Sequence, residues 1–285
     1  MASIFDFESK PDEYAVMGNP ITHSKSPLIH TAFAEQTQQR MQYSAIQVDP
    51  GGFAQAVGNF FAVGGKGLNV TVPFKGEAYN LTSELSPRAK LAGAVNTLKP
   101  TSDALLYGDN TDGIGLVRDL TNNLNITISG KRLLLIGAGG AARGVLGPLL
   151  EQQPAALTLA NRTLDKAQQL VATFSPEAPQ VKINAAPFSG LAEASFDLVI
   201  NATSASLKGE RLPIPATVFA ESAWSYDMMY GAEATPFMQW STSVGVSNVV
   251  DGLGMLVEQA AESFLIWRGI LPETTAVIQR IRQGL

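Results

Sequence analysis

The chain has 285 residues, of which 45% are hydrophobic and 16% charged, so it can bury a sizeable core, which argues against wholesale disorder. Its net charge of −5 argues against a nucleic-acid surface, which needs a basic face, but allows small anionic ligands held by a few local cations. Cysteine does not occur, which excludes disulfides, thiolate metal sites and a cysteine nucleophile, so we expect no metal centre and a reducing, cytoplasmic setting.

The first residues do not resemble a targeting segment. Met1–Lys10 contains acidic residues and no continuous apolar run, so it does not predict a secretory signal peptide. The most apolar region, around Leu133–Leu150, is interrupted by Arg143 and several glycines and does not predict a transmembrane helix. We therefore expect a soluble protein without a membrane or nucleic-acid partner.

Short apolar runs alternate with helical patterns, which is typical of an α/β protein with a parallel sheet. In the first half we expect strands at Tyr14–Met17, Tyr43–Val48 and Gly67–Val72, and helices at Pro27–Gln38 and Phe53–Val63. A domain boundary is expected near residues 108–131, where Gly108–Gly113 leads into a helix at Ile114–Thr121. Beyond it the pattern predicts strands at Arg132–Ile136, Ala156–Ala160, Asp197–Asn201 and Trp224–Asp227, and helices at Ala141–Gln152, Leu164–Phe174, Gly252–Gly269 and Glu273–Gln283.

Polar side chains near the first elements suit a hydroxylated acid. Ser24 and Ser26 precede a predicted helix, where hydroxyls and free amides hold carboxylates, although either serine could be only a helix cap. Asn69 and Thr71 alternate with apolar residues, so both point to the same face of their strand.

Two further polar residues lie in apolar surroundings. Asn96 interrupts a run of small and apolar residues, and Gln259 shares an apolar helix face with Met255 and Leu256. A buried glutamine needs hydrogen-bond partners, which are either backbone groups or a ligand.

Lys75 and Asp112 are the candidates for proton transfer, because histidine chemistry is limited to His23 and His30. Lys75 begins a predicted helix, whose dipole destabilises the ammonium and favours acid–base chemistry, although the residue could be an ordinary exposed lysine. Asp112 would lie in the first turn of a helix capped by Thr111, which explains it structurally without any function. An ionised Asp112 beside Lys75 would hold the ammonium and a substrate hydroxyl in register, but spacing does not place the two together.

A glycine-rich turn follows the strand that ends at Ile136. The turn, Gly137–Ala142, lets the backbone approach a pyrophosphate, whose charge then rests on the amides of the following helix. Alone the motif could be a purely structural tight turn. Strand, turn, helix and second strand in this order favour a dinucleotide site.

The end of the second strand of this unit indicates which dinucleotide binds. Enzymes that select NAD place an acid there, whereas this strand ends in Asn161, Arg162 and Thr163, with Lys166 one helical turn further on. A guanidinium suits the 2′-phosphate of NADP. Arg162 and Lys166 could be solvated surface charges, but they occupy the discriminating position and therefore predict NADP.

Taken together, these motifs resemble the shikimate dehydrogenase family over essentially the whole chain. The most specific segments, in this order, are Ser24–Pro27, Asn69–Lys75 and Gly108–Gly113. Further matching segments are Ala15–Pro27, Ala92–Thr97, Gly137–Arg143, Asn161–Thr163, Asn201–Ser204, Tyr226–Tyr230 and Asp251–Leu256.

The resemblance implies an α/β substrate domain, residues 1–111 and 252–285, and a Rossmann-type, doubly wound parallel-sheet NADP domain, residues 112–251. The C-terminal helices would return to the first domain. The implied activity is the NADPH-dependent reduction of 3-dehydroshikimate to shikimate in aromatic amino-acid biosynthesis. We expect a monomer or homodimer whose cleft between the domains opens and closes.

The resemblance also assigns roles residue by residue. Lys75 and Asp112 form the catalytic pair. The substrate-binding residues are Ser24, Ser26 and Tyr230 at the carboxylate, with Asn69, Thr71, Asn96, Asp112 and Gln259 around the ring. The NADP-binding residues are Gly137, Ala138, Gly139, Gly140, Ala141, Asn161, Arg162, Thr163 and Lys166, with Met228 and Gly252 near the nicotinamide.

The chain departs from the family pattern in two places. Met1–Lys10 precedes the usual start, and Ser206 stands where the family often has glycine, which leaves the conformation of loop 205–211 open. The nearest rival is a relative that also oxidises quinate, with NAD, and Arg162 argues against it. A non-catalytic dinucleotide sensor would not need Lys75 and Asp112.

Overall fold

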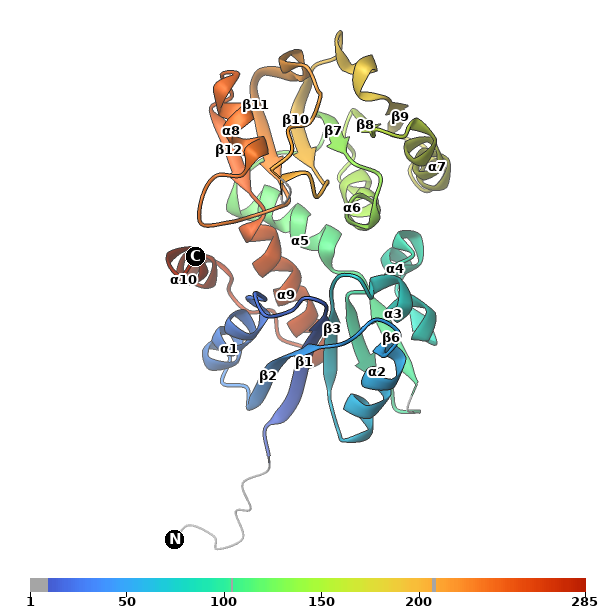
Figure 1. Ribbon diagram of the computed structural model, residues 1–285, viewed down its shortest axis with the longest axis vertical. Coiled ribbons are helices and arrows are strands. Elements are labelled where there is room, and N and C mark those ends of the chain that lie inside the picture. The colour runs from blue at the N-terminus through green and yellow to red at the C-terminus, as the bar shows by residue number, and fades with distance from the viewer. Residues whose placement is uncertain (1–9, 104, 207–208) are drawn as a thin grey trace, which may run out of the picture.

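The computed structural model describes residues 10–103, 105–206 and 209–285. The N-terminal extension before Lys10 and part of loop 205–211 therefore lie outside the described residues. The chain forms an elongated molecule with one sheet in each half, and helices lie between the halves (Figure 1).

The first sheet has six strands in the order β2-β1-β3-β5-β6-β4. It is mixed, which differs from the expected parallel sheet, because β5 runs antiparallel to both β3 and β6. The connection from β5 to β6 is too short for a crossover, so the two strands can only pair antiparallel. The strands are β1 (Asp12–Gly18), β2 (Met41–Gln47), β3 (Gly67–Val70), β4 (Glu84–Leu85), β5 (Thr97–Pro100) and β6 (Leu106–Asp109).

Four helices accompany this sheet, α1 (Ser26–Gln36), α2 (Phe53–Ala62), α3 (Lys75–Leu81) and α4 (Pro87–Ala92). The core between α2, α3 and the sheet includes stacked rings of Phe53 and Phe74, whose centroids lie 4.8 Å apart. The strand predicted to end at Val72 ends at Val70, so Thr71 lies in the loop that leads to α3. This loop positions the first residue of α3 at the end of the sheet.

The second sheet is parallel throughout, with strand order β12-β11-β10-β7-β8-β9. Its strands are β7 (Arg132–Ile136), β8 (Ala156–Ala160), β9 (Lys182–Ala186), β10 (Phe196–Asn201), β11 (Phe219–Asp227) and β12 (Asn248–Asp251). The chain reverses direction across the sheet between β7 and β10, and ligands of doubly wound folds bind at such a switch point. The predicted doubly wound fold is confirmed.

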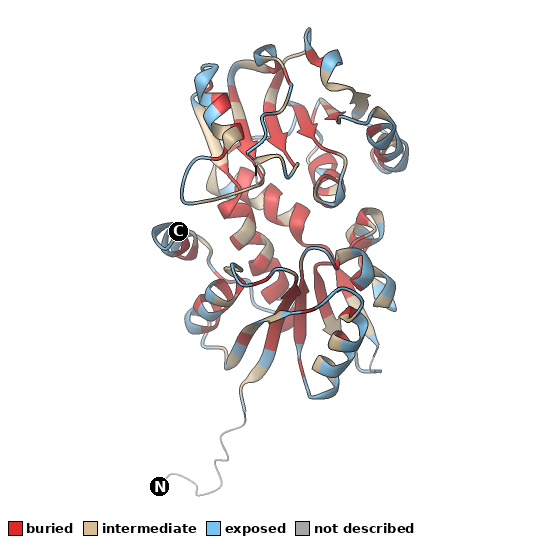
Figure 2. Cartoon of the chain, in the orientation of Figure 1, coloured by how far each residue is buried: buried red, intermediate tan, exposed pale blue. Residues whose placement is uncertain are grey.

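Both faces of this sheet are covered. The helices are α6 (Gly140–Glu151), α7 (Leu164–Phe174) and α8 (Pro236–Ser243), with short 3-10 turns at Ser175–Glu177, Phe188–Leu191 and Ala216–Val218. Apolar strand residues are buried on opposite faces, for example Leu133 and Leu135 in one cluster and Leu134 and Ile136 in another. Figure 2 shows the buried residues concentrated in the two sheets and in the helices between them.

Helices α5 (Asp112–Arg118) and α9 (Leu253–Arg268) join the two halves, and a π-helical turn at Asp119–Asn123 continues α5. They pack closely because Gly115 has no side chain: a Cβ there would lie 2.7 Å from the backbone nitrogen of Gln259. Helix α9 also packs on α1, and α10 (Thr275–Gln283) packs on both. The C-terminal helices therefore return to the first sheet, as expected. In the described part of the chain, no helix is long and apolar enough to cross a bilayer.

Candidate active site

A pocket of about 340 Å³ lies between the two halves of the molecule. It is lined by the ends of β1 and β3, by the first residues of α1 and α9, and by the segment that follows β11. All of the residues predicted to bind substrate line this pocket, together with Lys75: Ser24, Ser26, Asn69, Thr71, Asn96, Asp112, Tyr230 and Gln259.

Four helices begin at the pocket wall. Ser26 begins α1, Lys75 begins α3, Asp112 begins α5, and Gly252 precedes α9. Helix N-termini carry a partial positive charge on their free N–H groups. The pocket is therefore suited to an anionic ligand, although the protein as a whole carries a net charge of −5.

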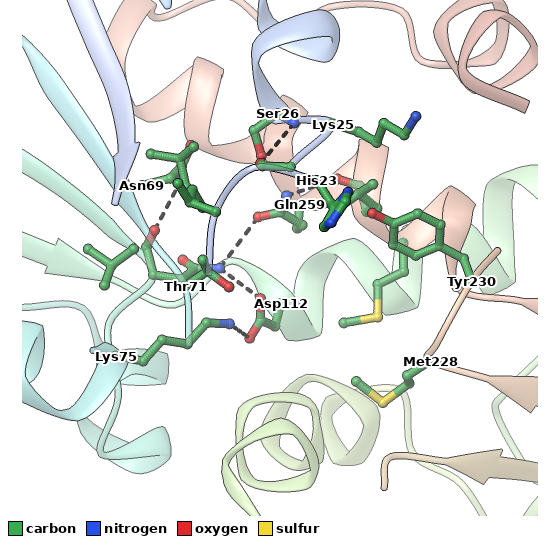
Figure 3. A pocket seen from close by; sticks show the side chains of 18 of the residues that line it. His23, Lys25, Ser26, Asn69, Thr71, Lys75, Asp112, Met228, Tyr230 and Gln259 are labelled. Atoms are coloured by element: carbon green, nitrogen blue, oxygen red, sulfur yellow. Dashed lines mark hydrogen bonds and ion pairs between the residues drawn. The ribbon is translucent and has the colours of Figure 1, made fainter. Parts of the chain in front are cut away.

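Lys75 and Asp112, which lie 37 residues apart in the sequence, meet in the pocket. The Lys75 ammonium donates to Asp112 Oδ2 over 2.6 Å (Figure 3). The Lys75 side chain is 29% exposed and that of Asp112 is 12% exposed, so the pair is largely shielded but open to a ligand. An amine beside a fixed carboxylate can exchange a proton with a substrate hydroxyl.

The Asp112 carboxylate is held in place from the opposite side. Asn96 donates its amide to Asp112 Oδ1 over 2.8 Å, and the backbone N–H of Asp112 donates to the side chain of Asn110 over 3.2 Å. Thus Asp112 Oδ1 accepts a hydrogen bond from Asn96, and Asp112 Oδ2 accepts one from Lys75. This division fixes the direction from which the ammonium can approach.

Thr111 occupies the N-cap position of α5, but the expected capping hydrogen bond is absent. Its hydroxyl instead lies 3.0 Å from the Asn96 amide nitrogen and 3.3 Å from Gln259 Oε1. The predicted positions, Thr111 at the N-cap and Asp112 in the first turn, are confirmed, but the Thr111 side chain joins Asn96 to α9 in place of capping the helix. Gln259 is in turn fixed by donating to the carbonyl of Leu256 over 2.9 Å.

Asn69 lines the pocket, but its amide is committed within the protein. Its oxygen accepts from the Tyr43 hydroxyl over 2.7 Å, and its nitrogen donates to the Asn96 carbonyl, Thr97 and Ser263 over 3.0–3.2 Å. The side chain is therefore placed to order the pocket wall. Thr71, which lies beyond the end of β3, is only partly buried and leaves its hydroxyl at the pocket.

Hydroxyl groups gather at the other end of the pocket. The Ser24 hydroxyl accepts from the backbone N–H of Ser26 over 3.3 Å, which closes the turn before α1. Tyr230 reaches the same region from the segment after β11 (Figure 3). Burial raises the pKa of Tyr230, so its hydroxyl keeps its proton and is a donor for a carboxylate. Ser24, Ser26 and Tyr230 therefore form a group of neutral donors.

The two histidines have different environments. His23 is exposed at the pocket rim, whereas His30 is fully buried and its ring stacks on that of Tyr43 at a centroid distance of 4.2 Å. Both ring nitrogens of His30 lack a hydrogen-bond partner among the described residues. His30 is therefore a core residue and is not available for catalysis.

The free energy of unfolding should fall in acid because of His30. Burial lowers the pKa of His30 from 6.5 to about 3. Since the unfolded chain binds this proton below about pH 6.5 and the folded chain does not, stability should decrease by up to about 1.4 kcal/mol per pH unit between these values. Urea unfolding of wild type and His30→Phe at pH 7, 5.5 and 4.5 measures this: the variant should lose less stability. Parallel losses would contradict the prediction, and His23→Ala is the control.

The glycine turn after β7 has the shape that a dinucleotide requires. Gly137 has φ +111°, and a Cβ there would lie 3.0 Å from the Thr203 side chain, so only glycine fits. A Cβ on Gly139 or Gly140 would meet nothing within 4 Å, which leaves open space before the N-terminus of α6. Ala138 and Ala141 complete this turn. The residues fit a pyrophosphate resting on the α6 amides.

The loop between β8 and α7 carries the predicted phosphate ligands. Asn161 donates its amide to the Thr163 carbonyl over 2.8 Å, which shapes the loop. Thr163 is the N-cap of α7, but its hydroxyl makes no capping hydrogen bond and remains available. Arg162 and Lys166 are exposed beside it. The residues that directly follow β8 thus present Arg162 and no acid, whereas Asp165 and Lys166 follow in α7, and the guanidinium fits a 2′-phosphate.

Met228 and Gly252 lie where the pocket meets the second sheet. A Cβ on Gly252 would lie 2.3 Å from the Met228 carbonyl oxygen, so this position requires glycine. Asp227, the residue before Met228, is fully buried. Its carboxylate accepts hydrogen bonds from Ser206, Thr235, Asn201 and the backbone N–H of Met229. Ser206, the departure from the family pattern, is thereby tied to β11 over 2.7 Å.

Several pocket residues were not predicted from the sequence. Lys25 and His23 lie at the rim, and Ile21, Met255 and Leu256 supply apolar wall. Lys25 lies between the two predicted serines, so its position in the sequence was a usable signal. The apolar residues carried no such signal, because they look like ordinary core positions.

Three family models match the chain. Residues 16–98 match the shikimate dehydrogenase substrate binding domain, residues 119–208 match shikimate / quinate 5-dehydrogenase, and residues 252–282 match the shikimate 5′-dehydrogenase C-terminal domain. The chain is 55% identical to a shikimate dehydrogenase (NADP(+)) of Methylobacillus flagellatus, over 95% of this chain and 99% of the relative. It is also 55% identical to the protein of that name from Dechloromonas aromatica, over 96% and 98%.

Solved structures show the same similarity. An Ael1 enzyme from Pseudomonas putida superimposes with a TM-score of 0.89 at 45% identity, over 94% of this chain and 97% of that chain. A shikimate 5-dehydrogenase from Thermus thermophilus, in complex with NADP(H) and shikimate, gives a TM-score of 0.84 at 29% identity, over 96% and 100%.

Proposed function

The chain belongs to the shikimate dehydrogenase family, and on that premise we propose that it interconverts 3-dehydroshikimate and shikimate with NADP, using Lys75 and Asp112 as its catalytic pair. The observation that carries this assignment is the 2.6 Å contact between Lys75 and Asp112 inside the pocket. The reaction is a step of aromatic amino-acid biosynthesis.

Lys75 moves the proton. When the ketone is reduced, its oxygen gains negative charge and Lys75 Nζ donates a proton to it; in the reverse direction the amine accepts the hydroxyl proton. Asp112 holds the ammonium in register through Oδ2. The bound NADP supplies or accepts the hydride. No other described histidine or lysine of the pocket lies against this carboxylate, which keeps the proton route to one side chain.

The remaining pocket residues bind and orient the substrate. Ser24, Ser26 and Tyr230 donate to its carboxylate, and Thr71, Asn96, Asp112 and Gln259 contact the ring hydroxyls. The amides of Asn69, Asn96 and Gln259 all make hydrogen bonds within the protein, and Asn69 also orders Asn96 by donating to its carbonyl, so we include Asn69 among the residues around the ring. This division leaves the ketone end of the ring beside Lys75.

The cofactor residues follow from the second sheet. Gly137, Ala138, Gly139, Gly140 and Ala141 would hold the pyrophosphate of NADP, and Asn161, Arg162, Thr163 and Lys166 would hold the 2′-phosphate and its ribose. Met228 and Gly252, which line the pocket where it meets the second sheet, would lie near the nicotinamide of a bound NADP.

Domain limits and assembly belong to the same proposal. We assign residues 1–111 and 252–285 to the substrate domain and residues 112–251 to the NADP domain, because the two sheets draw their strands from 12–109 and 132–251. The protein works in the cytoplasm as a monomer or homodimer. Binding in the pocket between the two domains suits closure that limits water access.

The test is initial-rate oxidation of shikimate by the purified protein, followed by absorbance of the reduced cofactor. Shikimate with NADP should give strong turnover, while quinate or NAD in parallel assays should give little. Comparable rates with quinate or NAD would assign the protein to a branch of broader specificity. A folded protein that binds NADP but turns over neither acid would overturn the proposed function.

A further inference from the structure

The positive charges at the pocket are unequally compensated. The Lys75 ammonium is paired with Asp112 at 2.6 Å, so this pair presents no net charge to a substrate. Lys25 also lines the pocket, and within the described residues no carboxylate forms an ion pair with it. Its Nζ makes one long hydrogen bond, 3.4 Å, to the carbonyl of Gly284, and that contact is exposed. Lys25 therefore retains an uncompensated charge at the pocket rim.

Lys25 lies at the end of the pocket remote from the proton-transfer pair. Its ammonium points away from Lys75 and Asp112, beyond Ser26 (Figure 3). It is the N-cap residue of α1, directly between Ser24 and Ser26, and its side chain makes no capping hydrogen bond. The cation therefore lies at the rim on the side of Ser26 and Tyr230, and it can approach the acid group of a ligand only by leaving its contact with Gly284.

The neutral donors at this end leave a charge to be balanced. Ser24, Ser26 and Tyr230 donate hydrogen bonds to a carboxylate but do not neutralise it. A net charge of −5 on the whole protein also repels an approaching anion. A single uncompensated ammonium at the rim can reverse that repulsion locally, because exposed charges act over about 10 Å at moderate salt.

We propose that Lys25 draws the carboxylate of the substrate into the pocket and pairs with it beside Ser24 and Ser26, which makes it a specificity-determining residue for anionic substrates. The inference rests on the proposed function, since it takes a carboxylate-bearing substrate for granted. Because Lys25 does not contact the reacting atoms, its loss should reduce capture of the acid and leave the chemical step unchanged. Binding of NADP, whose phosphates we assign to the residues after β7 and β8, should also be unaffected.

The experiment compares wild type with Lys25→Gln and Lys25→Arg in steady-state shikimate oxidation at 10 mM and 150 mM potassium chloride. Raising the salt shortens the screening length from about 30 Å to about 8 Å. We expect Lys25→Gln to lower kcat/KM for shikimate about fivefold at low salt, with kcat and the KM for NADP unchanged. The deficit should shrink at high salt, and Lys25→Arg should restore the wild-type value. Lys182→Gln, an exposed lysine on β9, is the matched control.

Two outcomes would overturn the proposal. A Lys25→Gln variant with wild-type kcat/KM at low salt would show that the charge has no effect. A deficit that persists at high salt and is not rescued by Lys25→Arg would show that the residue is structural. Wild-type turnover in the same assay distinguishes failure of the proposed function from failure of the role of Lys25. If wild type does not oxidise shikimate, the proposed function fails and the role of Lys25 with it. If wild type oxidises shikimate and Lys25→Gln is unchanged, only the role of Lys25 fails.

Discussion

Replacing Lys75 with alanine should lower kcat for shikimate oxidation at least about a hundredfold, as the loss of a positioned general acid–base group does. The reason is geometric. The Lys75 ammonium is the group that Asp112 holds at 2.6 Å inside the pocket, and alanine leaves the substrate hydroxyl without a partner that can take its proton. The Asn96–Asp112 contact at 2.8 Å does not involve Lys75, so the pocket should keep its shape.

The measurement is kcat and KM for both ligands, with the affinity for NADP determined separately by titration. NADP affinity should survive in Lys75→Ala, because the proposed cofactor contacts lie on the second sheet. Lys66→Ala is the matched control: Lys66 is exposed just before β3, away from the pocket, and should leave kcat unchanged. Near-normal turnover by Lys75→Ala would show that proton transfer uses a different group.

Long apolar runs made the second sheet predictable from the sequence. Strands β7 and β8 and helix α7 match their predicted bounds residue for residue. A strand buried on both faces reads as a continuous apolar run between turn residues, and α7 has a clear helical alternation of buried and exposed positions. For these three elements, the structure expected from the local sequence pattern is the one that tertiary packing produces.

Short and marginal elements were not predicted. Strands β4, β5 and β6 have 2–4 residues, too few for a period to be visible. Helix α4 has six residues but carried a readable signal: Ser86 caps it by accepting from Ala89, Pro87 follows the cap, and Gly93 ends it in a left-handed conformation. Strand β9 lies at the sheet edge and is only partly buried, so its apolar pattern is weak.

The sequence predicted which residues line the candidate site but not how their side chains contact one another. The motifs supplied the residues of the pocket, yet the contact between Lys75 and Asp112 depends on how α3 and α5 are placed by β3 and β6 of the first sheet. The amide of Asn69 shows the same limit: it bonds to Ser263, 194 residues away on α9, which no local pattern could indicate. Side-chain commitments of this kind follow from long-range packing alone.

Replacing Arg162 with alanine should weaken NADP binding roughly tenfold to a hundredfold, the cost of losing hydrogen bonds from a charged donor to a phosphate. The guanidinium is exposed at the loop after β8, where Asn161 closes the turn and Thr163 keeps an uncommitted hydroxyl. NAD has no 2′-phosphate, so its weaker binding should not change.

The test is titration of wild type and Arg162→Ala with NADP and with NAD, followed by the ratio of the two affinities. If the affinity for NADP divided by that for NAD falls while the NAD affinity is unchanged, Arg162 is the residue that recognises the 2′-phosphate. Lys166 then accounts for the remaining preference for NADP. Lys182→Ala, a lost cation on the neighbouring strand β9, should leave the ratio unchanged and so controls for general electrostatic attraction. Equal weakening of both dinucleotides would instead assign Arg162 a structural role, because only a phosphate contact can distinguish two ligands that are otherwise identical.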